Sequence, residues 1–374
     1  MGIKSLSKFL HETCPEIFEQ IHISEYHFRR VAIDTSLYLC NYKAQYAEKW
    51  LGAFVKLVAC LRENEIHCVF IYDSGFPPEK EAEQRERRER RAKLEQRVLR
   101  LEEAIDKYHS SGEIDNILFE FQDKRRIGHT SMLRAKSINI KGIEYAVQKL
   151  RKQLFTITSQ DFETTKRLFD VLKVPYFHAP LEAETMCADL CMQGKVDAVL
   201  TEDTDVLAYG ANVFLTKLNT TDGTCMRIKH SELLEKVGLS ADEFLDFCIM
   251  CGTDYNKNIF RVGPSKALKL IQTHKSIDNL GMDVSILNHK RVRQLFREYK
   301  RNDGTVPYCG FPDFETLQTF LVQKNVHVDT DSIKKSFIHN VIIFEDDEEK
   351  EEEEKEEEKE EEKEEEEVII LEDD

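Results

Sequence analysis

The chain has 374 residues, and its 70 acidic and 53 basic residues give a net charge of −17. Residues 345–374 account for this charge, because they hold 22 acidic residues and 4 lysines. Residues 1–344 hold 48 acidic and 49 basic residues, so this part of the chain can bind a polyanionic partner. No apolar run approaches the roughly 18 residues of a membrane span, and the first ten residues lack a signal peptide's apolar core, so we expect neither a membrane nor a secreted protein.

Three short apolar runs, at residues 29–34, 68–73 and 197–203, are predicted strands that each end in an acidic residue. Between the first two, Leu51–Glu63 has apolar residues at helical spacing. Strands separated by helical stretches predict βαβ units and a mostly parallel sheet. Ligands of such sheets bind beyond the carboxyl ends of the strands, so we expect a site there.

The rest of the chain is predicted to be largely helical. A long charged helix is expected over residues 79–107, where glutamates precede basic residues by four positions. Residues 108–155 are basic and give no sheet signal. Other expected elements are a helix at 161–173, a strand at 174–178, and helices through the 240s and from Pro264. From Glu345 the chain is too charged to bury a core, so a solvated tail is expected.

The ten cysteines are scattered, and most of them lie beside apolar residues. The close pair Cys248 and Cys251 has no second pair, whereas a structural zinc site usually takes four ligands. We therefore expect reduced, buried thiols of an intracellular protein.

Acidic residues mark the boundaries of the predicted strands and helices. Hard divalent cations take oxygen ligands, and two Mg²⁺ ions about 4 Å apart need carboxylates from several segments. Each acid alone has a plainer explanation as a turn residue, a helix cap or a partner of the helix dipole. Five separate segments with acids at such boundaries favour a metal site for phosphoryl chemistry. The candidates are Asp34, Asp73, Glu182, Glu184, Asp203, Asp205 and Asp254.

The same acids lie in motifs that occur in a fixed order. The motifs are Met-Gly-Ile-Lys-Ser-Leu at the start, Val-Ala-Ile-Asp34, Phe-Ile-Tyr-Asp73 before Pro77-Pro78, Ala-Pro-Leu-Glu182-Ala-Glu184, Thr-Glu-Asp203-Thr-Asp205 and Cys-Gly-Thr-Asp254-Tyr. Over about residues 1–105 and 156–275 the chain resembles the flap endonuclease/XPG family of structure-specific 5′ nucleases. The resemblance implies an α/β, PIN-like nuclease fold with a mostly parallel sheet, a helical arch and a helix–hairpin–helix-type element.

The resemblance also implies cleavage of DNA near single-strand/double-strand junctions with two Mg²⁺ ions, which Mn²⁺ can replace. The products would be a 5′-phosphate and a 3′-hydroxyl. Asp34, Asp73, Glu182 and Glu184 would hold or orient one ion. Asp203 and Asp205 would hold the other, with Asp254 nearby, partly through water.

Two basic residues match the family's arch. Lys80 and Arg87 are seven apart, so on a helix they share a face about 10 Å apart. The resemblance implies that they position the scissile phosphate and stabilise charge developing on it. The alternative is a solvated, salt-bridged helix or a nuclear-targeting cluster.

Phe260–Lys266 resembles the family's phosphate-gripping element, which often binds K⁺. Pro264 suits a first helical turn, whose N–H groups would face a DNA phosphate. The family usually has Gly where this chain has Arg261, so the sequence leaves open whether this chain keeps the tight turn of the family's element. An ordinary helix start is the alternative. The expected DNA-binding residues are Gly2, Arg261, Gly263, Ser265 and Lys266.

Several departures point to a divergent member of the family, such as one from a large DNA virus. The 39 residues from Asp34 to Asp73 leave little room for the family's wedge and 3′-flap pocket, which argues against a strict double-flap preference. Cys40 stands where flap enzymes have a base-stacking Tyr. The 109 residues from Asp73 to Glu182 predict an enlarged arch or cap. No PCNA-binding box is present.

We expect the chain to be organised in five regions. They are 1–105 (N-terminal nuclease region and start of the arch), 106–155 (arch or cap insertion), 156–285 (internal nuclease region, with the helix–hairpin–helix-type element at about 240–275), 286–344 (C-terminal helical extension) and 345–374 (acidic disordered tail). We expect a monomer that acts on branched or flapped DNA in the nucleus or at a viral replication site. The tail would recruit a basic partner, mimic DNA, or only solubilise the chain.

Two other functions stay open on the sequence. One is an RNA-cutting PIN-type enzyme, and the other is a non-catalytic protein that binds or scaffolds DNA junctions. The presence of all seven acids together with Lys80 and Arg87 favours an enzyme, because a pseudo-nuclease is expected to have lost some of them.

Overall fold

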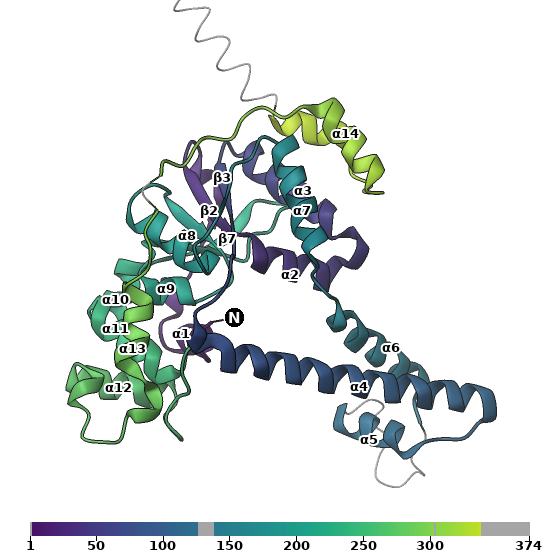
Figure 1. Ribbon diagram of the computed structural model, residues 1–374, viewed down its shortest axis with the longest axis horizontal. Helices are drawn as coiled ribbons and strands as arrows, with labels where there is room; N and C mark the ends of the chain where they lie inside the picture. The colour runs from purple at the N-terminus through teal and green to yellow at the C-terminus, as the bar shows by residue number, and fades with distance from the viewer. Residues whose placement is uncertain (1, 126–137, 303, 338–374) are drawn as a thin grey trace, which may run out of the picture.

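A computed structural model describes residues 2–125, 138–302 and 304–337 of the protein. Within these residues, a seven-stranded sheet of order β1-β7-β6-β5-β2-β3-β4 forms the centre (Figure 1). The strands from β6 to β4 run parallel, whereas β7 pairs antiparallel with both β6 and β1 at one edge, so the predicted mostly parallel sheet is confirmed. The strands are β1 (Glu19–His22), β2 (Arg30–Asp34), β3 (His67–Tyr72), β4 (Tyr176–His178), β5 (Ala198–Leu200), β6 (Val213–Thr216) and β7 (Thr224–Lys229).

Helices cover both faces of the sheet, as the βαβ pattern predicts. One core lies between the sheet and α2 (Thr35–Tyr46), α3 (Trp50–Glu63), α7 (Ser159–Val171) and α14 (Phe314–Gln323). The other lies under α1 (Leu6–Thr13), α8 (Ala183–Met192), α9 (Asp205–Tyr209), α10 (His230–Val237), α11 (Ala241–Cys251), α12 (Pro264–His274) and α13 (His289–Arg297).

The two cores follow from the side-chain alternation of the strands. Along β2, Val31 and Ile33 belong to the core of α3, whereas Ala32 belongs to the core of α8. All three are fully buried, because a parallel strand covered on both faces has no polar side. Such strands read as continuous apolar runs, which is why the sequence indicated them.

A helical arm projects from this body. Figure 1 shows α4 (Glu81–Ser111) running outward, with α5 (Asn116–Arg125) and α6 (Ile140–Arg151) packed on its far half and the chain returning through α6 to α7. A third, separate core holds these helices together, with Val98, Leu101 and Phe121 among its buried residues. Residues 126–137 of the expected insertion and the expected tail at 345–374 lie outside the described residues.

All of the cysteines lie within the described residues. All ten thiols are free. Cys248 and Cys251 are buried in α11, among the apolar residues of the α8 core, as the alternative to zinc binding predicts. No helix of the described ranges is long and apolar enough to cross a membrane.

Candidate active site

The first two predicted acids lie at the carboxyl ends of adjacent parallel strands. Asp34 is the last residue of β2, and its Oδ1 accepts a hydrogen bond from the Leu37 amide at 3.0 Å, which caps α2. Asp73 directly follows β3, and its Oδ1 accepts the Ala183 amide at 2.6 Å. Asp34 therefore has the local cap function that it could have alone, whereas Asp73 bonds an amide 110 positions away. These bonds fix both carboxylates at this edge of the sheet.

The other acids come from three further elements. Glu182 is the N-cap residue of α8 and Glu184 lies in its first turn, and both are buried. Asp203 follows β5, and its Oδ1 accepts the amide of Asp205, the first residue of α9, at 3.0 Å. Asp254 lies in the loop after α11. Segments far apart in sequence thus meet at one edge of the sheet.

A cavity of about 280 Å³ brings most of the predicted residues together. Asp205 does not line it, but lies buried next to Asp203. The cavity also contains Cys40 and Phe76, the latter 45% exposed. The predicted residues that line the cavity are Asp34, Asp73, Glu182, Glu184, Asp203, Asp254, Lys80 and Arg87.

The carboxylates repel one another in a poorly solvated space. Burial, followed by the charge of Asp73, raises the pKa of Asp34 well above its usual value. Burial likewise raises the pKa of Glu184 and of Asp203. For Asp205, burial acts together with the charges of Asp203 and Asp254 to raise the pKa. This edge of the sheet therefore concentrates negative charge that a cation would neutralise.

Lys80 is a buried cation among these acids. Its Nζ forms an ion pair with Glu182 and lies 3.2 Å from Asp254 Oδ2 and 3.5 Å from Glu184 Oε1. Burial opposes its charge, but the carboxylates of Glu184, Glu182 and Asp254 outweigh that effect and raise the pKa of Lys80 above its usual value. The ammonium group is therefore charged at neutral pH.

Arg87 reaches the same acids from the next turns of α4. Its guanidinium donates to Asp254 Oδ2 at 2.8 Å and pairs with Glu83 on its own helix. Lys80, at the start of this helix, and Arg87 thus both point at the acidic cavity, whereas Arg88 and Arg90 are exposed. The solvated-helix alternative describes the outer face of α4 but not these two side chains.

The carboxylates of this site are chemically suited to a hard divalent cation, but their side chains are not arranged as the ligands of one ion. In the described part of the chain, no three His, Cys, Asp or Glu side chains are arranged so that they could hold a metal ion. Both carboxylate oxygens of Asp205, however, are buried without a hydrogen-bond partner. A buried carboxylate without a partner is costly, and a cation would remove that cost. Carboxylate oxygens are the ligands that Mg²⁺ prefers.

Gly2 packs directly against the side chains of Asp203 and Asp205. Its φ of +85° lies in the region that favours glycine, and an added Cβ would lie 2.6 Å from Asp205 Oδ1 and 2.9 Å from Thr204 Oγ1. The backbone at Gly2 therefore approaches these side chains as closely as a residue without a Cβ allows.

The predicted phosphate-gripping residues lie at the start of α12, apart from the acidic cavity. Gly263 is the N-cap residue and Pro264 the first helical residue. Arg261 has a φ of +59°, so the chain keeps the left-handed turn that a glycine would favour, and its guanidinium lies 5.1 Å from the ring centre of the exposed Phe260. Arg261, Gly263, Ser265 and Lys266 are all exposed.

Two tyrosines beside the acids were not predicted. The Tyr255 hydroxyl donates to Glu182 Oε2 at 2.6 Å, and the Tyr209 hydroxyl lies 2.9 Å from that of Tyr255. A signal did exist for both, since Tyr255 directly follows Asp254 and Tyr209 lies one helical turn after Asp205. Their bonds to residues far along the chain could not be read from the sequence.

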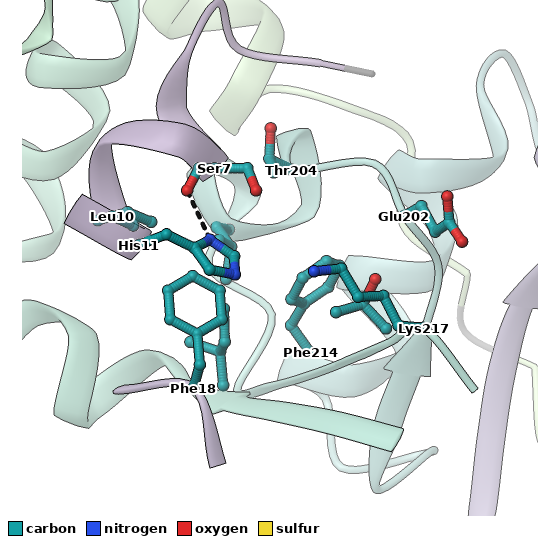
Figure 2. Close-up of a pocket in the computed structure, with 11 residues that line it drawn as sticks. Ser7, Leu10, His11, Phe18, Glu202, Thr204, Phe214 and Lys217 are labelled. Atoms are coloured by element: carbon teal, nitrogen blue, oxygen red, sulfur yellow. Dashed lines mark hydrogen bonds between the residues drawn. The ribbon is translucent and has the colours of Figure 1, made fainter. Parts of the chain in front are cut away.

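A second pocket, of about 180 Å³, lies beside the loop that contains Asp203. Figure 2 shows His11 against the ring of Phe18, with a ring centre distance of 3.7 Å, and its Nδ1 bonded to the Ser7 carbonyl at 2.8 Å. Lys217 and Glu202 also line this pocket. None of the predicted site residues lines it.

Sequence comparison identifies the family of this chain. The XPG N-terminal domain matches residues 1–94, and the XPG I-region matches residues 173–254. A probable RAD2-like endonuclease of Invertebrate iridescent virus 6 is 32% identical over 380 residues, which are 90% of this chain and 92% of the relative. The chain belongs to the XPG family. It is accordingly a structure-specific nuclease, a phosphodiester hydrolase, which favours the enzyme over the non-catalytic scaffold.

Further relatives of this XPG-family nuclease include cellular enzymes. Flap endonuclease 1-B of Xenopus laevis is 29% identical over 348 residues, which are 86% of this chain and 81% of that protein. Among solved structures, the catalytic core of Rad2 in complex with DNA substrate is similar with a TM-score of 0.62 at 16% identity, over 90% of this chain and 99% of that one. This similarity establishes the PIN-like fold that the motifs predicted. Nucleases of the family are generally metal-dependent.

Proposed function

We propose that this nuclease hydrolyses DNA at junctions between single and double strands, as a 5′ flap endonuclease, a 5′–3′ exonuclease or both, with two Mg²⁺ ions. The observation that supports this most strongly is the cavity in which six predicted acids meet Lys80 and Arg87. Viral and eukaryotic relatives support a role in DNA replication, repair or recombination, in the nucleus or at a viral replication site.

The acids would divide between the two ions. Asp34, Asp73, Glu182 and Glu184 would hold or orient one ion, and Asp203 and Asp205 the other, with Asp254 nearby, partly through water. When bound, such ions supply an activated water and stabilise the charge of an in-line displacement. The protein contributes carboxylate oxygens as ligands, and both oxygens of Asp205 are buried and free of competing hydrogen bonds.

Lys80 and Arg87 would bind the scissile phosphate. Both are cations that line the acidic cavity, and the carboxylates around them stabilise their charge. Charged donors that are in place before the reaction stabilise an increase in phosphate charge without reorganisation. No protein nucleophile is required, since water attacks the phosphorus.

The exposed start of α12 would grip the duplex. The backbone N–H groups at a helix N-terminus favour phosphate. Arg261 and Lys266 would add charge there, and Ser265 a hydroxyl donor. Gly2, with its backbone against the acids, would meet the DNA near the cut. K⁺ would bind at the turn before α12, as the family resemblance implies.

Cleavage of a panel of labelled substrates tests the proposal. The panel holds 5′-labelled flap, nicked, bubble and single-stranded DNA, with an RNA copy of the flap, each incubated with Mg²⁺, with Mn²⁺ or with EDTA. We expect metal-dependent cutting near the junction of DNA, with 5′-phosphate and 3′-hydroxyl ends. Preferential cutting of the RNA flap would favour the RNA-cutting enzyme. Tight junction binding without metal-dependent cutting would contradict the proposal and restore the scaffold.

A further inference from the structure

The carboxylate of Glu182 is held from two sides. One oxygen, Oε1, pairs with the Lys80 ammonium group, and the other, Oε2, accepts the Tyr255 hydroxyl at 2.6 Å. Glu182 and Tyr255 are both buried. A short bond from a phenol to a carboxylate in a poorly solvated place is strong, and it fixes the rotation of the carboxylate plane.

A second tyrosine continues this chain of bonds. The hydroxyls of Tyr209 and Tyr255 lie 2.9 Å apart. Because Tyr255 gives its single proton to Glu182, Tyr209 must donate to Tyr255. A phenol has an ordinary pKa of about 10, so both hydroxyls are protonated at neutral pH and can donate.

The two tyrosines connect elements that hold the different acids. Tyr255 directly follows Asp254, Tyr209 ends the short helix that Asp205 begins, and Glu182 starts α8. The tyrosines do not line the acidic cavity. They line another cavity of about 190 Å³ together with Tyr299, and Glu182 lines both cavities. They are therefore placed to act on Glu182 without touching DNA in the acidic cavity.

We propose that Tyr255 and Tyr209 are positioning residues that hold Glu182 in the orientation in which it binds a metal ion. The hydrogen-bonded relay Tyr209–Tyr255–Glu182 fixes the Glu182 carboxylate relative to α9, the helix that begins at Asp205. It thereby holds the acids of the two proposed ion sites in fixed positions relative to each other. This inference rests on the proposed function, because it takes Glu182 as a metal ligand.

The relay predicts the effects of removing single hydroxyl groups. Tyr255→Phe keeps the ring and its packing but frees Glu182 Oε2. Since partners behind a metal ligand typically change affinity about 10–100-fold, we expect a loss of Mn²⁺ affinity in that range. Tyr209→Phe should cost less, because Tyr209 acts on Glu182 through Tyr255, although the variant also loses the hydrogen bond between Tyr209 and Thr185. In the double variant, Tyr209→Phe should cause no further loss of Mn²⁺ affinity, because the effects of residues linked by hydrogen bonds are not additive.

The experiment measures Mn²⁺ binding by the full-length protein without DNA, from the electron paramagnetic resonance signal of free Mn²⁺. The Mg²⁺ dependence of single-turnover cleavage at saturating substrate is a second readout. The matched control is Tyr299→Phe. Tyr299 lines the same cavity, and its ring lies 5.9 Å from that of Tyr209, but no bond joins it to Glu182 in the described structure. Melting temperatures of all variants check the fold.

The expected result is weaker Mn²⁺ binding and a higher Mg²⁺ requirement in Tyr255→Phe, with both unchanged in Tyr299→Phe. Wild-type Mn²⁺ affinity in Tyr255→Phe, or an equal loss in Tyr299→Phe, would overturn the inference. Glu182→Gln separates this failure from that of the proposed function. If Glu182→Gln loses Mn²⁺ and Tyr255→Phe does not, only the relay is wrong. If Glu182→Gln binds Mn²⁺ like the wild type, the inference fails together with the assignment of Glu182 as a metal ligand.

Discussion

Gly2 has a backbone position that no other residue can occupy without movement of the acids. Alanine there would have an unfavourable positive φ and would overlap Asp205 and Thr204. Gly194 offers a control, because its φ of +67° is also positive but nothing lies within 4 Å of an added Cβ. Each alanine should cost about 1–2 kcal/mol of backbone strain, so the two variants differ mainly in the contact with the acids.

We therefore expect Gly2→Ala to slow junction cleavage by at least about tenfold, roughly 1.4 kcal/mol of the activation barrier, while Gly194→Ala cuts at the wild-type rate. Cleavage rates and melting temperatures of both variants are measured together. Equal rates in the two variants would show that the approach of Gly2 to the acids does not matter for catalysis.

Asp205 makes the stability of the metal-free protein depend on pH. Burial, with the charges of Asp203 and Asp254, raises its pKa well above the usual value. The folded state therefore keeps this proton at pH values where the unfolded chain, with a pKa of about 3.9, has lost it. The stability that the proton gives is complete below the unfolded pKa and is lost as the pH rises through the raised pKa.

Asp205→Asn removes this loss. In EDTA we expect its melting temperature to match the wild type at low pH and to exceed it by a few degrees at neutral pH, and Mg²⁺ should narrow the gap by stabilising the wild type more than the variant. Thermal melts at several pH values check this. A variant that is less stable than the wild type at neutral pH in EDTA would contradict the account of a repelled, partnerless carboxylate.

At the scale of elements, strands β2, β3, β4 and β5 were predicted from the sequence, whereas β1, β6 and β7 were not. The runs that became β2, β3 and β5 are apolar on both faces, which a sequence shows directly. Strands β1 and β7 are half exposed, and their pairing is supported by Arg227 of β7 with Glu19 of β1, a contact 208 positions apart in sequence. Such pairing depends on tertiary structure rather than on local pattern.

The same limit applies to the site. The acids, Lys80 and Arg87 could be placed because boundaries of elements and family motifs mark them. Tyr255 lies in one of these motifs, yet its bond to Glu182 joins positions 73 apart. The arm formed by α4, α5 and α6 was expected from charge and length, but its own small core, separate from those of the body, appears only in three dimensions.

At the scale of the whole molecule, charge separates the folded body from the tail. The body is nearly neutral overall, but its acids gather at one sheet edge, with cationic side chains from α4 beside them and exposed basic residues at α12. A nuclease needs this separation, because DNA phosphates bind basic residues whereas metal ions bind acids. The account thus depends on the acidic cavity working as a metal-dependent catalytic centre.

Single-turnover cleavage of the preferred junction tests that claim most directly, using the wild type, Asp203→Ala and Glu202→Gln. Asp203 lines the acidic cavity, whereas its neighbour Glu202 is exposed and lines the second pocket. The account predicts Mg²⁺-dependent cutting that falls by about 10³-fold or more in Asp203→Ala, several kcal/mol of metal stabilisation, and is unchanged in Glu202→Gln. Wild-type cutting by Asp203→Ala, or cutting by the wild type that persists in EDTA, would contradict it.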